Sequence, residues 1–442
     1  MKPADTVPEE GPGTSPPAAQ SEPAEPSPSG RKGLLRRGAG GALSWVVGAD
    51  TLVMTVLSIF SALVIGALLM IVTNSSTLAA WARFPSNPGG AFATSWSLVA
   101  AAYGALLTGS VGSPSAYVHF FTTGSAAAFN TAFNPLSETL VDTAPLLLAG
   151  LALTLAFKAG LFNIGGPSQI IAGAIMAGWV GLTMSNLPLA IHMPLALLAG
   201  CFGGAVAGWI PGVLRARTGA HEVIVTIMLN YVALNLLVFV LGLQVFLPPG
   251  GTNSVSRPIL ASAMLPLLAG SGLRLNASIL IAAAAAVAVA WLLSRTTIGF
   301  RFRMVGGSHD AARAAGVDIP RAITLAFVLS GILCGLAGAV MILGISPQLV
   351  QNYGGDTGFT AFIIALLGRG KPGGVVLAAL LFGAFQAGGL QMQVSTSVPL
   401  ELIEVIEAVI VFFISAPGLV RAIYRIRVGG GGFRLLSQGW GG

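Results

Sequence analysis

The sequence predicts an all-α integral membrane protein with about ten transmembrane helices, both termini in the cytoplasm and some of the helices short or broken. Only 8% of its 442 residues are charged and its mean hydropathy is +0.83, whereas soluble domains carry about 25% charged residues. Apolar runs recur from residue 44 to residue 416, so we expect one transmembrane domain at 31–428 in the cell membrane. The net charge is +7, and the basic residues lie in short clusters between these runs. This pattern is typical of basic residues that orient a protein in the membrane rather than of nucleic-acid binding.

The two ends of the chain differ from this domain in composition. Residues 1–30 are rich in Pro, Ser, Glu and Ala, so they are expected to be a disordered cytoplasmic tail. The basic patch RKGLLRR at 31–37 precedes an apolar run long enough to span, which predicts a first transmembrane helix rather than a cleaved signal. Residues 429–442 are glycine-rich and are expected to form a flexible tail.

The distribution of basic residues orients the predicted spans. If the chain starts inside, then of its 22 Lys and Arg residues Lys2 lies in the tail, Arg83, Arg257 and Arg274 lie outside, and the other 18 are cytoplasmic. Cytoplasmic loops of membrane proteins carry such an excess of positive charge. The predicted spans are 44–72, 138–157, 164–184, 189–213, 223–247, 276–293, 323–345, 358–368, 372–393 and 399–416.

Three segments depart from regular spans. The apolar run 92–109 would invert every later charge assignment if it crossed, so we expect a re-entrant or interfacial segment at the outer surface. The run 358–368 is too short for a regular crossing, and Gly, Asn and Pro interrupt the segment 160–174. Broken helices are tolerated where they are buried in protein or face water. A solute pathway between the two interruptions, or two tight turns between packed helices, would each explain them.

No catalytic motif emerges, and we do not expect an enzyme. His221 and Glu222 have no second histidine at the spacing of a zinc protease, and no P-loop for ATP occurs. Cys201 and Cys334 fall inside predicted spans, where small packing residues are more common than a disulfide or a metal site. Three carboxylates share one face of the last span. Glu401 lies near the outer edge and is expected to be solvated, whereas Glu404 and Glu407 are either hydrogen-bonded structural groups or part of a polar path.

The polar stretch GFRFRMVGGSHDAARAAGVDIPRA, at 299–322, predicts a two-turn helix outside the membrane. Ser308 suits the N-cap, the alanines favour a helix, and Gly316 suits a left-handed C-terminal cap. Ala311, Ala312 and Ala315 should share one face, where methyl groups allow another surface to approach closely. We therefore expect a docking helix in the loop 295–322.

This stretch, followed by LSGILCGLAGA, resembles the cytoplasmic coupling loop of permeases of ATP-binding cassette (ABC) importers for branched-chain amino acids, ribose and nucleosides. PLLLAGLALTLAFKAGLFNIG (145–165), EVIVTIMLNY (222–231) and GFTAFIIALLGRGKPGGVVLAALLFGA (358–384) are similar to the longer permease of nucleoside-type systems. The resemblance covers most of 138–416. Where that subgroup usually has Asn-Ile-Gly-x-Glu-Gly-Gln, this chain has Pro167 at the acidic position, which affects any inference about substrate.

The resemblance implies a permease for nucleosides or simple sugars that works by alternating access. It implies a second permease subunit, a cassette ATPase and an extracellular substrate-binding lipoprotein as partners, besides membrane lipid. ATP and Mg would then be bound by the ATPase, with no cofactor and no metal in this chain. It also assigns ATPase coupling to the loop, at Gly306, Ser308, Ala311, Ala312, Ala315 and Gly316.

The solute pathway is predicted from uncharged groups near the two interruptions, although each of the polar ones could instead satisfy a neighbouring helix. They are Asn163, Gln169, Asn230, Phe359 and Thr360. Glu222 begins a helix near the cytoplasmic face, where a dipole or capping role is favoured. The alternative function is a self-sufficient carrier coupled to protons through Glu404 and Glu407, which would leave the docking helix unexplained.

Overall fold

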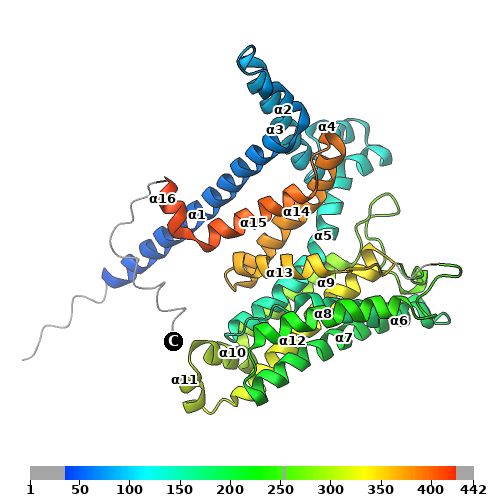
Figure 1. Ribbon diagram of the computed structural model, residues 1–442. Helices are drawn as coiled ribbons and strands as arrows, with labels where there is room; N and C mark the ends of the chain where they lie inside the picture. Colours follow the sequence, from blue (N-terminus) through cyan, green and yellow to red (C-terminus); the bar gives the residue numbers. More distant parts are fainter. Residues whose placement is uncertain (1–34, 252–254, 425–442) are drawn as a thin grey trace, which may run out of the picture. The chain divides into compact units, whose positions relative to one another are not determined.

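The structure, a computed structural model, describes residues 35–251 and 255–424, and within them all regular elements are helices (Figure 1). The two predicted tails, 1–30 and 429–442, lie outside the described residues. The α-helices are α1 Leu35–Thr73, α2 Ser75–Ala82, α3 Pro88–Ser110, α4 Pro114–Thr123, α5 Ala126–Lys158, α6 Gly166–Thr183, α7 Leu189–Thr218, α8 Glu222–Leu241, α9 Ser278–Arg295, α10 Thr297–Gly307, α11 His309–Ala314, α12 Ile319–Val340, α13 Gly355–Leu367, α14 Pro372–Thr396, α15 Glu401–Ser415 and α16 Pro417–Tyr424. A 3-10 turn η1 (Ala261–Ala263) and a π-turn η2 (Met341–Ile345) complete them.

Backbone contacts divide the chain into two units, Met1–Val53 and Met54–Gly442. Of the first unit the structure describes residues 35–53, which are the first part of α1. The packing described below and the candidate site lie in the second unit.

Eight described helices are long and apolar enough to cross a membrane, and α15 with α16, bent by 94°, could make a ninth span. The all-α membrane class is therefore confirmed. The set differs from the ten predicted spans in three places: α6 and α13 are not in it, and α3 is. The sequence predicted a re-entrant or interfacial segment at 92–109, whereas α3 is unbroken over 23 residues. That expectation came from the distribution of basic residues along the chain and not from the length of this apolar run.

Helix α5 is the centre of the main core. Its stretch from Val141 to Ala156 is buried at every residue except Asp142. An apolar helix of a membrane protein can face protein or lipid, and this stretch faces protein on all sides. It packs against α9, α12, α13 and α14. This central position places the end of α5 beside the loop 295–322.

Helices α6, α7 and α12 pack side by side at close range (Figure 1). Four glycines of α7, spaced four residues apart from Gly200 to Gly212, face the backbone of α12. A β-carbon at Gly204 would collide with the carbonyl oxygen of Gly331, and one at Gly173 with Gly335. Small residues let helix backbones approach in this way in membranes.

A second apolar cluster joins α1, α3, α14 and α15. Gly109 of α3 lies against Gln391 of α14, and the Tyr103 hydroxyl donates to the carbonyl of Leu63 in α1 at 2.5 Å. Helix α3 is thus attached to the helices of the bundle by packing along one face. This cluster lies outside the polar region described next.

Candidate functional site

The loop 295–322 forms α10 and α11 and then leads into α12. The Ser308 hydroxyl accepts a hydrogen bond from the amide of Ala311 at 3.3 Å, so Ser308 caps α11 as predicted. Gly316 has φ of +74°, the left-handed conformation expected just after the helix. Asp318 caps α12 by accepting from the amide of Arg321 at 3.0 Å. The two caps predicted from the sequence, at Ser308 and Gly316, are therefore confirmed.

Ala312 does not face outward, and this corrects the predicted alanine face. It is fully buried in a cluster with Phe302 and Val305 of α10 and with Phe327 of α12. Ala311 in the same short helix and Ala315, its C-cap residue, are exposed. Ala312 therefore anchors α11 to the body of the protein, and a direct contact of its side chain with a partner is not possible in this conformation.

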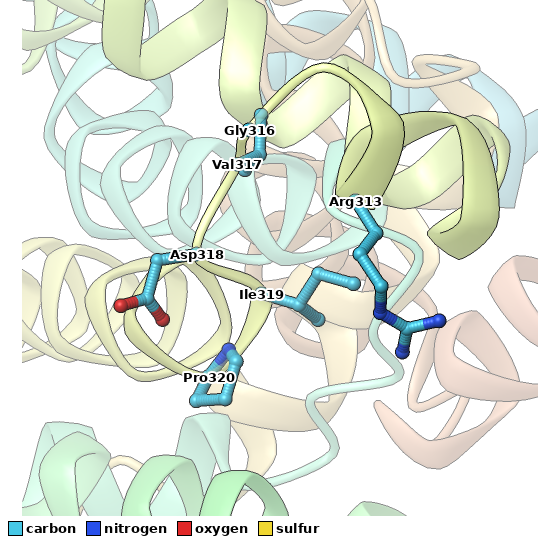
Figure 2. A pocket seen from close by; sticks show the side chains of 6 residues that line it. All are labelled: Arg313, Gly316, Val317, Asp318, Ile319 and Pro320. Atoms are coloured by element: carbon cyan, nitrogen blue, oxygen red, sulfur yellow. The ribbon is translucent and has the colours of Figure 1, made fainter.

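A surface depression lies where α11 ends and α12 begins (Figure 2). Exposed ion pairs join Arg313 to Asp310 at 3.2 Å and Arg321 to Asp318 at 3.1 Å, so the charges around it are balanced locally. The depression and the exposed alanines form one continuous stretch of chain that a partner could contact. It is lined by Arg313, Gly316, Val317, Asp318, Ile319 and Pro320.

Three predicted pathway residues meet at the turn between α5 and α6. The Asn163 amide group donates to Ser330 of α12 at 2.9 Å and to Gln169 at 3.2 Å, and its oxygen accepts from the amide of Gly165. Asn230 of α8 accepts from the amide of Ser168 at 3.1 Å and donates to the carbonyl of Ile164 at 3.0 Å. Asn163, Gln169 and Asn230 are all buried, so they form a hydrogen-bonded network that ties the start of α6 to α8 and α12.

The other two predicted pathway residues lie on α13. A β-carbon at Gly166 would lie 3.0 Å from the carbonyl oxygen of Gly358, so the starts of α6 and α13 touch. The side chain of Phe359 is 54% exposed and Thr360 is half-buried. The structure thus brings together the two interruptions noted in the sequence, with the buried amides on one side and the accessible groups on α13.

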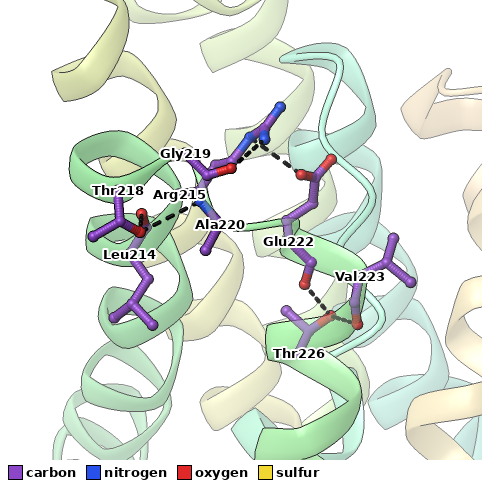
Figure 3. Close-up of polar contacts among 8 residues, drawn as sticks. All are labelled: Leu214, Arg215, Thr218, Gly219, Ala220, Glu222, Val223 and Thr226. Atoms are coloured by element: carbon purple, nitrogen blue, oxygen red, sulfur yellow. Dashed lines mark hydrogen bonds and ion pairs between the residues drawn. The ribbon is translucent and has the colours of Figure 1, made fainter.

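Glu222 is held by an ion pair across the turn between α7 and α8 (Figure 3). Its Oε2 lies 3.1 Å from Nε of Arg215, whose Nη1 donates to the carbonyl of Gly219 at 3.2 Å. Thr226, one helical turn further on, would lie 3.2 Å from a β-carbon on Gly165. The position of Glu222 in the first turn of α8 agrees with the predicted dipole role. Its ion pair with Arg215 also joins α8 to α7.

Sequence reasoning missed a polar cluster on another part of α5. Arg274 pairs with Glu138 at 2.9 Å and donates to the carbonyl of Ile345, the last residue of η2, at 3.2 Å. Asp142 follows Glu138 by one helical turn. Two carboxylates four residues apart in a largely apolar helix were the available signal, but their distant partner Arg274 could not be identified from spacing.

The carboxylates of α15 have different environments. Glu401 and Glu404 are exposed, whereas Glu407 is buried and its Oε1 has no hydrogen-bond partner. The exposure of Glu401 agrees with its expected solvation, and Glu404 and Glu407 do not share one environment.

The described residues form an all-helical membrane bundle, and the segment 296–318 lies between two candidate spans. Such an architecture suits a transport subunit. Residues 135–415 match the family described as branched-chain amino acid transport system / permease component. The chain belongs to this family. It is the permease subunit of an ABC importer, a multi-pass protein of the plasma membrane rather than an enzyme, and the family works with ATPase and substrate-binding components.

Several curated proteins are similar over most of their length. A guanosine ABC transporter permease of Bacillus subtilis is 35% identical over 68% of this chain and 87% of its own. A nucleoside ABC transporter permease of Lactococcus lactis subsp. cremoris is 36% identical over 65% and 81%. A glucose ABC transporter permease of Haloferax volcanii is 37% identical over 63% and 75%. No solved structure gives a significant match. Family membership decides against the self-sufficient proton-coupled carrier.

Proposed function

We propose that this permease imports nucleosides or related small polar solutes, with simple sugars as the other members of the class. The observation that carries the proposal is the similarity to permeases named for guanosine, nucleosides and glucose. The polar groups near the two interruptions are amides and a hydroxyl, which suit an uncharged solute rich in hydrogen-bonding groups. Pro167 stands at the position where the subgroup usually has an acid, so this chain has no carboxylate at that position.

The solute pathway that we propose passes the start of α13 and the start of α6. Phe359 and Thr360 have accessible surface and can contact a solute directly: an aromatic ring packs on a base or a sugar ring, and a hydroxyl donates or accepts. Asn163, Gln169 and Asn230 are buried and bonded to one another or to the backbone. Their role in transport would be to hold the shape of this wall.

The partners that we propose are a second, shorter permease, a cassette ATPase and an extracellular lipoprotein that delivers the solute. ATP and Mg belong to the ATPase. Its docking surface on this chain would comprise the exposed residues Ser308, Ala311, Ala315 and Gly316 together with the depression in Figure 2. Gly306 and Ala312, which contact the body of this chain, would support that surface from within.

Uptake by the reconstituted complex tests the substrate class. Proteoliposomes holding both permeases and the ATPase, supplied with the lipoprotein and ATP, should accumulate labelled guanosine, adenosine or glucose and should not accumulate leucine. Thr360→Val keeps the shape of the side chain and removes the hydroxyl, so KM should rise about fivefold to tenfold for loss of one hydrogen bond. Thr183→Val is the matched control. Uptake of leucine alone would overturn the proposal.

A further inference from the structure

The end of α5 has a geometry that a single glycine makes possible. The amide of Leu161 donates to the carbonyl of Ala156 and that of Gly160 to Phe157, both at 3.0 Å, and Gly160 has φ of +73°. This pair of bonds is a Schellman cap, which satisfies the last carbonyls of a helix. Leu161 is buried in the same cluster as Val305 and Ala312. The cap of α5 and the loop 295–322 therefore share one small core.

Gly306 of α10 touches this cap through backbone atoms. A β-carbon on Gly306 would lie 2.5 Å from the carbonyl oxygen of Lys158 and 2.8 Å from the amide nitrogen of Gly160. A β-carbon on Gly160 would in turn lie 3.0 Å from Cα of Gly306. Backbone atoms cannot rotate away as a flexible side chain can, so any side chain at Gly306 must separate α10 from the end of α5. The other side of Gly306 is exposed.

The cap of α5 is connected to both helices of the proposed pathway, α6 and α13. Asn163, two residues after Leu161, holds the start of α6 and Ser330 of α12. On another side, the Lys158 side chain lies 3.2 Å from a β-carbon on Gly370, in the turn between α13 and α14. Short contacts therefore connect α10, through the cap of α5, to the start of α6 and to the turn after α13.

We infer that the backbone contact of Gly306 with Gly160 transmits movement from the docking loop to the solute pathway, so that Gly306 is a positioning residue for transport rather than a contact for the ATPase. The inference rests on the proposed docking and pathway. The burial of Ala312 supports it, because α11 and α10 then move with the cap as one body. Loss of the contact should leave the ATPase bound and active but no longer linked to the pathway.

Gly306→Ala tests this with Gly307→Ala as its control. Both residues end α10 and neither has a positive φ, but a β-carbon on Gly307 would meet nothing within 4 Å. A single cysteine at Thr360, in a Cys201→Ala, Cys334→Ala background, reports on the pathway through thiol labelling with and without trapped ATP. We expect the nucleotide to change labelling at least about fivefold in the background and in Gly307→Ala, and to leave it unchanged in Gly306→Ala.

A second pair of variants tests the same contact in case Gly306→Ala misfolds. Gly160→Ala and Gly219→Ala introduce equal strain at φ of +73° and +70°, but only Gly160 has a close neighbour. Only Gly160→Ala should lose the nucleotide response. The inference is overturned if Gly306→Ala still responds, or if it loses the ATPase during co-purification, since Gly306 would then act in docking. The readout needs no solute, so a failure of the proposed substrate class would appear separately, as absent uptake by the wild-type complex.

Discussion

Every hydrogen-bonding atom of the Asn163 side chain already has a partner within the protein. The sequence predicted a polar group near a break, and it left open whether that group serves the solute or a neighbouring helix. Burial and saturated bonding favour the second role for Asn163. Thr360 on α13 keeps accessible surface. Asn163 and Thr360 were predicted for the same role, but their different burial assigns them different roles.

Asn163→Leu should therefore destabilise the permease before it affects solute recognition. The change leaves Ser330 and the amide of Gly165 without their partner, and each buried unsatisfied group costs about 1–3 kcal/mol. Thermal unfolding of the purified complex in detergent should show a clear loss, and Ser330→Ala, which removes one bond, should show a smaller one. Wild-type stability combined with impaired uptake would instead make Asn163 a solute contact.

The Arg274 and Asn276 contacts show why some residue roles could not be predicted from the sequence. Asn276 donates to the carbonyl of Gly344 at 2.7 Å, and Arg274 to that of Ile345. Both carbonyls belong to η2, a π-turn in which the regular helical pattern is lost. Nothing in the local sequence MILGI marks such a turn, because its freed carbonyls are satisfied by side chains almost 70 residues away.

At the scale of helices, the fold shows which small residues lie between neighbouring backbones. The glycines of α7 and α12 allow backbone contact at Gly204 with Gly331 and Gly335. The sequence showed abundant glycine in membrane helices, but the partner helix follows only from the fold. The local cap signals at Ser308 and Gly316 were predicted correctly because they depend on neighbours within a few residues.

Gly204→Ala should destabilise the bundle, although Ala favours a helix over Gly by about 1 kcal/mol. The added methyl group meets backbone of α12 that cannot move aside, and such overpacking costs about 1–3 kcal/mol. Gly104→Ala in α3 is the control, because nothing lies within 4 Å of its β-carbon, and it should be neutral or slightly stabilising. The measurement is the thermal midpoint of each purified variant. Equal midpoints would mean that α7 and α12 can separate without cost.

For the whole molecule, the orientation in the membrane stays a prediction from the basic residues. Impermeant thiol reagents should reach Ser308→Cys from the cytoplasmic side and Ser271→Cys from outside, in a background without Cys201 and Cys334. Asn87→Cys and Ser115→Cys flank α3, and both should label from outside, because a crossing by α3 would place the basic patch 31–37 outside. Labelling of the last two from opposite sides would make α3 a span.

The proposed docking of the ATPase depends on which residues of α11 face inward. In an isolated helix Ala311, Ala312 and Ala315 share a face, so sequence alone could not tell which methyl groups point inward. Tertiary contacts with α10 and α12 select Ala312 for burial. Ala311 and Ala315 stay exposed and would form the proposed contact with the ATPase. The same substitution at Ala312 and at Ala315 should therefore impair transport for different reasons.

Ala315→Glu should give a stable permease that no longer co-purifies with the ATPase, because the carboxylate occupies the docking surface. Ala312→Glu places an unpaired charge among Phe302, Val305 and Phe327, which costs several kcal/mol. That variant should show reduced yield or a lowered thermal midpoint even when the permease is purified alone. If Ala312→Glu is as stable as wild type and loses only the ATPase, then Ala312 faces the partner, and the inward packing of α11 is not the state in which the motor binds.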